Sequence, residues 1–373
     1  MNNSYRISVI LPSRDETETI GECIRKIRDV FNCHNIDGEI IVSDNSNDGT
    51  PEIAKSLGAK VVTPDRLGYG YAYLYGFKYA SGDILVLGDA DGTYDFSEIP
   101  RLLDPILKGE ADLVIGSRLK GKIEKGAMPW LHRYIGNPIL TFILNLLFKA
   151  GVSDAHSGFR AIRRDALERL SLKSHGMEFA SEMILKASLM GLRIREVPIT
   201  YYPRRGGKSK LKSLRDGWRH LKFMLLYAPS SLYAYPGLSL SIIGLLLMLF
   251  GYFEVYIGYT PGLHSMILGS FCLLTGFQLI FLSLFAWSYG AKYRSSKFMN
   301  SVLKHLKLER GILIGLVALL MAIIYLTILF INWLNSGFTV LPLRGEDIIA
   351  FTSLTLGLQI IFNSILISGM TEK

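Results

Sequence analysis

Two acidic residues separated by one small residue, Asp89 and Asp91, follow a short apolar segment at residues 84–87. Such a segment between turn residues is typical of a buried strand in a parallel sheet, and ligands of these sheets bind beyond the carboxyl ends of the strands. Side chains two residues apart on an extended chain point the same way, so both carboxylates can face one ligand. Their repulsion favours a hard cation such as Mg²⁺, completed by diphosphate oxygens. The pair therefore predicts a metal site, and the alternative is a solvated turn.

Alternating strands and helices are predicted around this pair. The residue patterns indicate strands at 7–12, 39–43, 60–63 and 112–118, and helices at 20–31 and 68–79. A further helix is expected to begin at Thr50, with Thr50 as the N-cap and Pro51 at the first helical position. Alternation of this kind implies an α/β fold with a mostly parallel sheet and helices on both faces.

The composition favours a membrane partner. The 373 residues are enough for two domains, and their mean hydropathy of +0.28 is high for a soluble protein. The net charge is +9, and the basic residues gather beside apolar segments, which favours an anionic membrane surface over nucleic acid. Three cysteines without metal or redox spacing are expected to be inert thiols, and no secretory signal is expected at the N-terminus.

The last third of the chain predicts a membrane domain. Four apolar runs, each long enough to cross a bilayer, lie near 234–256, 264–289, 311–333 and 347–369. The loop between the second and third runs holds six basic residues against one acid, so the positive-inside rule places this loop in the cytoplasm. We therefore expect a multi-pass integral membrane protein, with a cytoplasmic catalytic domain at 1–230 and four helices within 231–373.

Two further segments have the character of interfacial helices. Residues 130–150 contain an apolar block that is too short to span a bilayer. Residues 211–225 place apolar side chains three and four residues apart, with basic residues between them. That pattern is typical of a helix lying in the membrane interface, and the alternative is a surface helix packed on a core.

Four motifs together resemble a known family. They are Ile-Ser-Val-Ile-Leu-Pro-Ser-Arg-Asp-Glu at 7–16, Asp-Asn-Ser-Asn-Asp-Gly-Thr at 44–50, Asp-Ala-Asp at 89–91 and Ser-Gly-Phe-Arg at 157–160. In this order they resemble inverting family-2 glycosyltransferases of GT-A fold, and more narrowly the polyprenyl-phosphate (dolichyl-phosphate) mannose and glucose synthases. The resemblance covers about residues 5–230, and the membrane part resembles the four-helix appendix of some members.

The resemblance implies a reaction and a set of site residues. The reaction is inverting transfer of a hexose from GDP-mannose or UDP-glucose to a polyprenyl (dolichyl) phosphate at the cytoplasmic membrane face, with Mg²⁺ or Mn²⁺. The implied residues are Pro12, Arg14, Glu16, Asp44 and Asp89 for the nucleotide; Asp89 and Asp91 for the metal; Arg118, Arg133, Asn137, Ser157 and Arg160 for the acceptor phosphate; and Arg204, Arg205 and Lys208 for the loop over the donor. Asp89, Asp91 and Arg118 are the implied catalytic residues. Two positions depart from the family pattern: Ser43 replaces a frequent aspartate, and Gly-Thr-Tyr-Asp-Phe follows Asp91.

Elementary chemistry agrees with this reaction. A departing nucleoside diphosphate gains negative charge, which a metal on the acid pair and a cationic loop would stabilise. A phosphomonoester has a second pKa of about 6, so a lipid phosphate is mostly dianionic at pH 7 and hardly needs a general base. It needs orientation, for which arginine is suited, and Arg118, Arg133 and Arg160 are the candidates. Asp154 is expected to position this acceptor site, although a role as base stays open.

Other polar and aromatic residues leave alternatives open. Glu178 and Glu182 are either exposed acids or contacts to sugar hydroxyls, and His156 is consistent with a structural histidine. The tyrosines at 69, 71, 73 and 75 either pack their helix or stack on a sugar.

Two rival functions remain at this point. A processive membrane polysaccharide synthase would carry a Gln-x-x-Arg-Trp motif, which the sequence lacks. A non-catalytic nucleotide-binding membrane protein would not need both acids and the phosphate-binding arginines. No nucleic-acid partner is expected, and the oligomeric state does not follow from the sequence.

The variant Asp91→Ala distinguishes an enzyme from a binder. We expect it to lose sugar transfer, because one of the two predicted metal ligands is removed, while the protein remains folded. The measurement is transfer of labelled sugar together with the thermal unfolding temperature. Full activity in a folded Asp91→Ala protein would contradict the predicted role of the acid pair.

Overall fold

The computed structural model describes residues 5–206, 213–227, 231–290 and 308–371. It divides into two compact units, Met1–Leu226 and Tyr227–Lys373, and each is described by itself. The predicted donor-loop residue Lys208 and most of the predicted basic loop, residues 291–307, lie outside the described residues.

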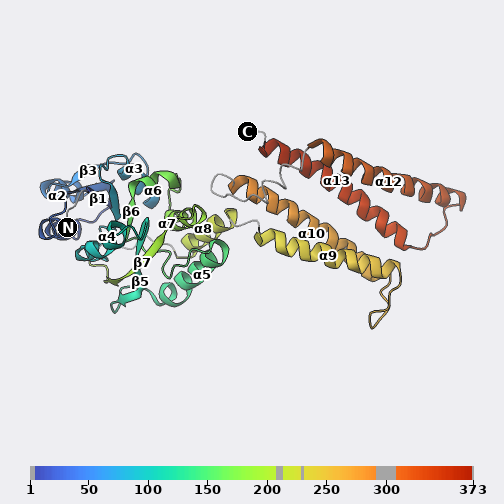
Figure 1. Ribbon diagram of the computed structural model, residues 1–373, viewed down its shortest axis with the longest axis horizontal. Coiled ribbons are helices and arrows are strands. Elements are labelled where there is room, and N and C mark those ends of the chain that lie inside the picture. The colour runs from blue at the N-terminus through green and yellow to red at the C-terminus, as the bar shows by residue number, and fades with distance from the viewer. Residues whose placement is uncertain (1–4, 207–212, 228–230, 291–307, 372–373) are drawn as a thin grey trace. The chain divides into compact units, whose positions relative to one another are not determined.

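The first unit is built on a seven-stranded sheet (Figure 1). In spatial order its strands are β3 (Lys60–Val62), β2 (Gly38–Asp44), β1 (Ile7–Ser13), β4 (Ile84–Leu87), β6 (Arg160–Arg163), β5 (Leu113–Ile123) and β7 (Ile194–Tyr201). All neighbouring pairs are parallel except those of β6, which runs antiparallel to both β4 and β5. The predicted mostly parallel sheet is confirmed, and β6 and β7 are strands that the sequence patterns did not predict.

Helices cover both faces of this sheet, as predicted. In chain order they are α1 (Ile20–Cys33), α2 (Thr50–Ser56), α3 (Tyr69–Phe77), the short turn η1 (Phe96–Glu98), α4 (Ile99–Leu107), η2 (His132–Gly136), α5 (Asn137–Phe148), α6 (Arg164–Leu170), α7 (Phe179–Leu189) and α8 (Ser213–Leu226). Alternate residues of a strand point to opposite faces. Val9 and Leu11 accordingly pack in the core with α1 and α4, whereas Ile10 packs in the core with α3 and α7.

The start of α2 differs from the expectation. The N-cap is Gly49, and the Thr50 side chain does not cap the helix. Instead, the Thr50 hydroxyl accepts a hydrogen bond from the Glu16 backbone N–H at 3.0 Å, and Asp48 accepts from the Thr50 N–H at 3.0 Å. The predicted capping threonine therefore joins the loop after β1 to the loop after β2.

The order of the strands in the sheet determines where the predicted site residues lie. The chain moves outward from β1 to β2 and β3, then returns to the other side of β1 at β4. In open α/β sheets, ligands bind beyond the carboxyl ends of the strands at such a switch point. Residues that follow β1, β2 and β4 therefore meet at one edge of the sheet.

Segment 130–150 folds into η2 and α5, with an apolar side open to solvent in this unit. Its exposed large side chains are Trp130, Leu131, Tyr134, Ile135, Ile139, Phe142 and Leu146. Trp218 on α8 is also exposed, whereas Met224 on the same helix is fully buried. We call the exposed set, with Trp218, the apolar face.

The described residues of the second unit form four long helices, α9 (Ser231–Tyr252), α10 (Leu263–Gly290), α12 (Leu308–Asn335) and α13 (Gly345–Thr371). Each is long and apolar enough to cross a membrane, in agreement with the four predicted spans. Helices α9 and α10 pack side by side, as do α12 and α13 (Figure 1).

Glycines allow close packing of α9 on α10. A Cβ atom on Gly244 would lie 2.5 Å from the Gly269 carbonyl oxygen, and one on Gly269 would lie 2.7 Å from the Gly244 oxygen. Gly237 and Gly276 oppose each other in the same way one heptad along. Small residues of this kind let membrane helices approach backbone to backbone.

Replacing one of these glycines should loosen the hairpin. We expect Gly244→Leu to destabilise it by about 1–3 kcal/mol, because the new side chain must push two backbones apart. Leu245→Phe, at an exposed neighbouring position, is the matched control. The measurement is the temperature at which purified protein in detergent loses its monodisperse peak, and equal temperatures for the two variants would contradict the packing argument.

Candidate active site

The first two strand ends bring together predicted nucleotide residues. Pro12 and Ser13 lie opposite Ser43 and Asp44 in the parallel pairing of β1 with β2. The buried Asp44 carboxylate accepts hydrogen bonds from the Ser46 backbone N–H and hydroxyl, each at 2.8 Å. Arg14, in the loop after β1, is half exposed.

The acid pair lies directly beyond β4. Asp89 accepts a hydrogen bond from the Tyr69 hydroxyl at 3.0 Å, and Asp91 accepts from the Thr93 N–H at 3.1 Å and the Thr93 hydroxyl at 2.6 Å. Burial first, and then the charge of Asp91, raise the pKa of Asp89 to about 7. The two acids thus form the concentration of negative charge that a divalent cation would neutralise.

Arg204 supplies a positive charge at this point. It follows β7, and its guanidinium pairs with both Glu16 and Asp91, at 3.2 Å from the latter. Its Nε also donates to the Gly206 carbonyl oxygen at 2.7 Å. Arg205 instead pairs with Glu22 on α1 at 2.7 Å, on the surface of the unit. Of the two predicted donor-loop arginines, Arg204 is therefore the one that reaches the acid pair.

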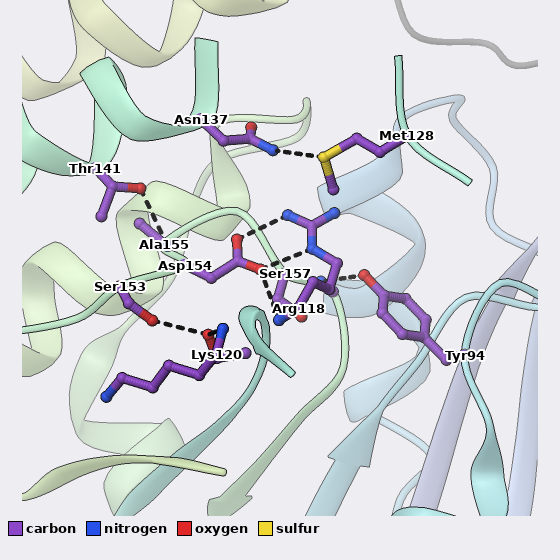
Figure 2. A network of polar contacts seen from close by, with 12 residues as sticks. Tyr94, Arg118, Lys120, Met128, Asn137, Thr141, Ser153, Asp154, Ala155 and Ser157 are labelled. Atoms are coloured by element: carbon purple, nitrogen blue, oxygen red, sulfur yellow. Dashed lines mark hydrogen bonds and ion pairs between the residues drawn. The ribbon is translucent and has the colours of Figure 1, made fainter. Parts of the chain in front are cut away.

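A second cationic group, Arg118, lies on β5. Its Nε and Nη2 donate to the two oxygens of Asp154 at 2.7 and 2.8 Å, and its backbone N–H donates to the same carboxylate at 3.0 Å (Figure 2). The guanidinium also lies 5.1 Å from the centre of the Tyr201 ring. Burial raises the pKa of Asp154, but the charge and hydrogen bonds of Arg118 outweigh it, so that the pKa is lower than usual. Asp154 is thus an ionised orienting group, in agreement with its expected positioning role.

The other predicted acceptor residues divide into two sets. Asn137, at the start of α5, lies near the Arg118 guanidinium in Figure 2 and donates to the Met128 sulfur at 3.6 Å. Arg133, on η2, lies with its guanidinium 5.3 Å from the centre of the Tyr134 ring. Ser157 is fully buried beneath Arg118, and its hydroxyl has no hydrogen-bond partner within the described residues.

Arg160 does not face the acceptor side. It is 1% exposed, and its guanidinium donates to the carbonyl oxygens of Ser157, Ala155 and Ala180 at 2.8 to 2.9 Å. Three backbone carbonyls thus take up the guanidinium, which ties the loop before β6 to α7. In the structure, Arg160 holds this loop and is not directed at the predicted acceptor phosphate.

The structure places Glu182 and His156 in the interior of the unit. Glu182 is neither exposed nor directed at a ligand: it is fully buried, pairs with Lys186 at 2.7 Å and accepts from the Lys173 and Ser174 backbones. His156 contacts His220 of α8 with ring centres 4.6 Å apart, and burial holds the pKa values of both histidines below the usual range.

Sequence reasoning missed the aromatic residues around the acids. Tyr94 (Figure 2) accepts a hydrogen bond from the Gly158 backbone N–H at 2.7 Å. The centre of its ring lies 5.3 Å from that of Tyr201 and 5.4 Å from that of Phe159. Tyr94 lies three residues after Asp91, and this short distance in the sequence could have indicated that Tyr94 belongs to the site. Tyr201 comes from the unpredicted strand β7, so the sequence offered no signal for it.

Comparison with known proteins shows that the chain is a glycosyltransferase. The model of glycosyl transferase family 2 matches residues 8–171, and that of the family-2 C-terminal transmembrane region matches residues 284–371. The chain belongs to glycosyltransferase family 2, and its first unit has the GT-A fold, as the sequence resemblance predicted.

Particular relatives are similar over most of the chain. The low-salt glycan biosynthesis hexosyltransferase Agl6 of Haloferax volcanii is 44% identical over 369 residues, which cover 98% of this chain and 89% of that protein. The glycosyltransferase AglJ of the same organism is 32% identical over 213 residues, covering 57% of this chain and 68% of that protein. A mycobacterial crystal structure matches with a TM-score of 0.50 at 24% identity, covering 60% of this chain and 74% of that one, which concerns the fold alone.

The Arg118–Asp154 pair should matter for stability. Asp154→Asn keeps the shape of the side chain but leaves a buried guanidinium without its counter-charge, so we expect a loss of about 3–5 kcal/mol. The control is Asp112→Asn, which breaks the more exposed pair with Arg193 and should cost at most about 1 kcal/mol. Denaturant unfolding followed by tryptophan fluorescence measures both, and similar losses would contradict the assigned importance of the buried pair.

Proposed function

We propose that the protein transfers a hexose, with inversion, from a nucleotide sugar to a polyprenyl (dolichyl) phosphate at the cytoplasmic face of a membrane. The observation that carries this proposal is the pairing of two sites: the acids Asp89 and Asp91 beyond β4, and the oriented cation Arg118 on β5. The first suits a nucleoside diphosphate with its metal, and the second suits a phosphate acceptor.

The donor would occupy the edge of the sheet at β1, β2 and β4. Pro12, Arg14, Glu16 and Asp44 would contact the nucleoside, and Asp89 and Asp91 would hold Mg²⁺ or Mn²⁺. Among the described residues, no group of three or more His, Cys, Asp or Glu could hold a metal. Two carboxylates nevertheless fit Mg²⁺, which is bound by one or two carboxylates plus substrate phosphates. When bound, the metal would neutralise charge on the departing diphosphate.

Arg204 would stabilise the same negative charge on the departing diphosphate. Arg204 stands after β7 in the predicted donor loop, and it already pairs with Glu16 and Asp91. A guanidinium in this place can bind diphosphate oxygens in a bidentate manner and stabilise the negative charge that grows on them.

The acceptor phosphate would bind at Arg118, with Arg133 and Asn137 from η2 and α5 and with the Ser157 hydroxyl. Asp154 fixes the Arg118 guanidinium by two hydrogen bonds, so less rotamer freedom is lost when a phosphate binds. The phosphate oxygen attacks the anomeric carbon as a dianion, and no protein base is required.

The apolar face supports a lipid as the carrier of this phosphate. Most of its exposed aromatic and aliphatic side chains lie on or just before η2 and on α5, the elements that also carry Arg133 and Asn137. Soluble proteins rarely leave such contiguous apolar surface in water, and interfacial helices bury it at the level of the lipid headgroups. The name of the relative Agl6, a glycan biosynthesis hexosyltransferase, is consistent with a hexose as the transferred group.

A donor panel tests the proposal. Purified full-length protein is incubated with Mg²⁺ or Mn²⁺, dolichyl phosphate and labelled UDP-glucose, GDP-mannose or other nucleotide sugars, and label in the organic phase is counted. We expect transfer from one donor to dolichyl phosphate and none to dolichol, which lacks the phosphate group that the arginines would bind. Arg118→Gln should abolish most of this transfer at unchanged nucleotide affinity. Absence of transfer from every donor with folded protein would contradict the proposed reaction.

A further inference from the structure

The tyrosine-rich helix α3 has two different faces. Residues four apart lie on one side of a helix, so Tyr69 and Tyr73 share a face and Tyr71 and Tyr75 share another. Tyr71 donates to the exposed Asp65, and the Tyr75 hydroxyl bonds that of Tyr79 at 3.2 Å, both near the surface. Tyr69 and Tyr73 instead point to the strand ends. Helix α3 therefore has one pair of tyrosines at the surface and another pair directed at Asp89 and Asp91.

The inward tyrosines share one acceptor atom. The Tyr69 hydroxyl lies 3.0 Å from Asp89 Oδ1, and the Tyr73 hydroxyl lies 3.4 Å from the same oxygen. An ordinary phenol has a pKa of about 10, so both hydroxyl groups carry a proton at neutral pH and can donate it to this oxygen. Two hydroxyl groups of α3 thus hold one oxygen of the Asp89 carboxylate.

Ring packing fixes these two hydroxyl groups in place. The Tyr73 ring stacks on Phe179 of α7, with centroids 5.2 Å apart and an interplanar angle of 6°. The Tyr69 ring meets Tyr73 edge to face at 5.2 Å and meets Phe179 at 6.5 Å. A donor held by such contacts has little rotamer freedom, which makes it an effective orienting group.

The other carboxylate oxygen is confined from the opposite side. A Cβ atom on Gly158 would lie 2.8 Å from Asp89 Oδ2 and 2.9 Å from the Tyr69 hydroxyl oxygen. The Gly158 backbone is itself held by its hydrogen bond to Tyr94. Rotation of the Asp89 carboxylate is therefore limited by the hydroxyl groups of α3 at one oxygen and by the close approach of the loop before β6 at the other.

We propose that Tyr69, supported by Tyr73, is a positioning residue of the metal site, which holds the Asp89 carboxylate in the orientation that a divalent cation and its bound diphosphate require. The inference rests on the proposed function, in which Asp89 is a metal ligand. Hydrogen-bonding partners of a metal-ligating carboxylate set its orientation, and their removal typically weakens metal binding by about 10- to 100-fold.

The test measures metal binding without turnover. Free Mn²⁺ is titrated into full-length protein in detergent, with UDP or GDP and no acceptor, and the unbound Mn²⁺ is followed by its electron paramagnetic resonance signal. We expect Tyr69→Phe to weaken Mn²⁺ binding by about 10- to 100-fold. Tyr71→Phe, on the same helix but directed at Asp65, is the matched control and should bind as the wild type does.

A second variant approaches the carboxylate from the other side. Gly158→Ala brings a methyl group against Asp89 Oδ2 and should also weaken Mn²⁺ binding, even if Tyr69→Phe does not fold. Unchanged binding in folded Tyr69→Phe, or in folded Gly158→Ala, would overturn the inference. Absence of Mn²⁺ binding to the wild type with either nucleotide would instead contradict the proposed metal-dependent function.

Discussion

The candidate site depends on the balance of charge at the carboxyl edge of the sheet. Glu16, Asp89 and Asp91 converge there, and their environment excludes enough water to raise the pKa of Asp89 to about 7. Without counter-charges such a group of acids would oppose folding of the edge. Arg204 brings one cation to Glu16 and Asp91, and the neutral phenols of α3 meet Asp89. Ion pairs and hydrogen bonds thereby stabilise this edge, and a metal and a diphosphate would add interactions of the same kinds.

Strand β6 links this edge to the acceptor side. Strand β6 runs antiparallel between β4 and β5, so the start of β6 pairs with the end of β4. The loop that precedes β6 therefore lies beside the end of β4. That loop carries Asp154, which orients Arg118, and Gly158, which lies against Asp89. Arg160 then anchors the loop through three backbone carbonyls. One short segment of chain thus contacts both Arg118 on β5 and Asp89 beyond β4.

The sequence predicted what depends on local patterns. Strand β4 with its acids, the mostly parallel sheet and the four apolar helices follow from periodicity and length. Strand β6 escaped because it has four residues with arginine at both ends, and Glu182 escaped because an acid at i and a lysine at i+4 are usually exposed. Contacts between distant residues, such as Tyr69 with Asp89 or Arg204 with Asp91, depend on how strands are ordered in space. Residue spacing carries no information on that order, so the motifs indicated a candidate site but not the contacts of Tyr69 and Arg204 within it.

The close approach at Gly158 has a consequence for how this enzyme can diversify. A methyl group or a larger side chain there would press on the Asp89 carboxylate and the Tyr69 hydroxyl, so a substitution would disturb both groups at once. Arg133 and Asn137 are half-buried and stand on η2 and α5, outside the sheet, so this restriction does not apply to them. Sequence changes along that segment would therefore alter the surroundings of Arg133 and Asn137 and leave the acid pair in place.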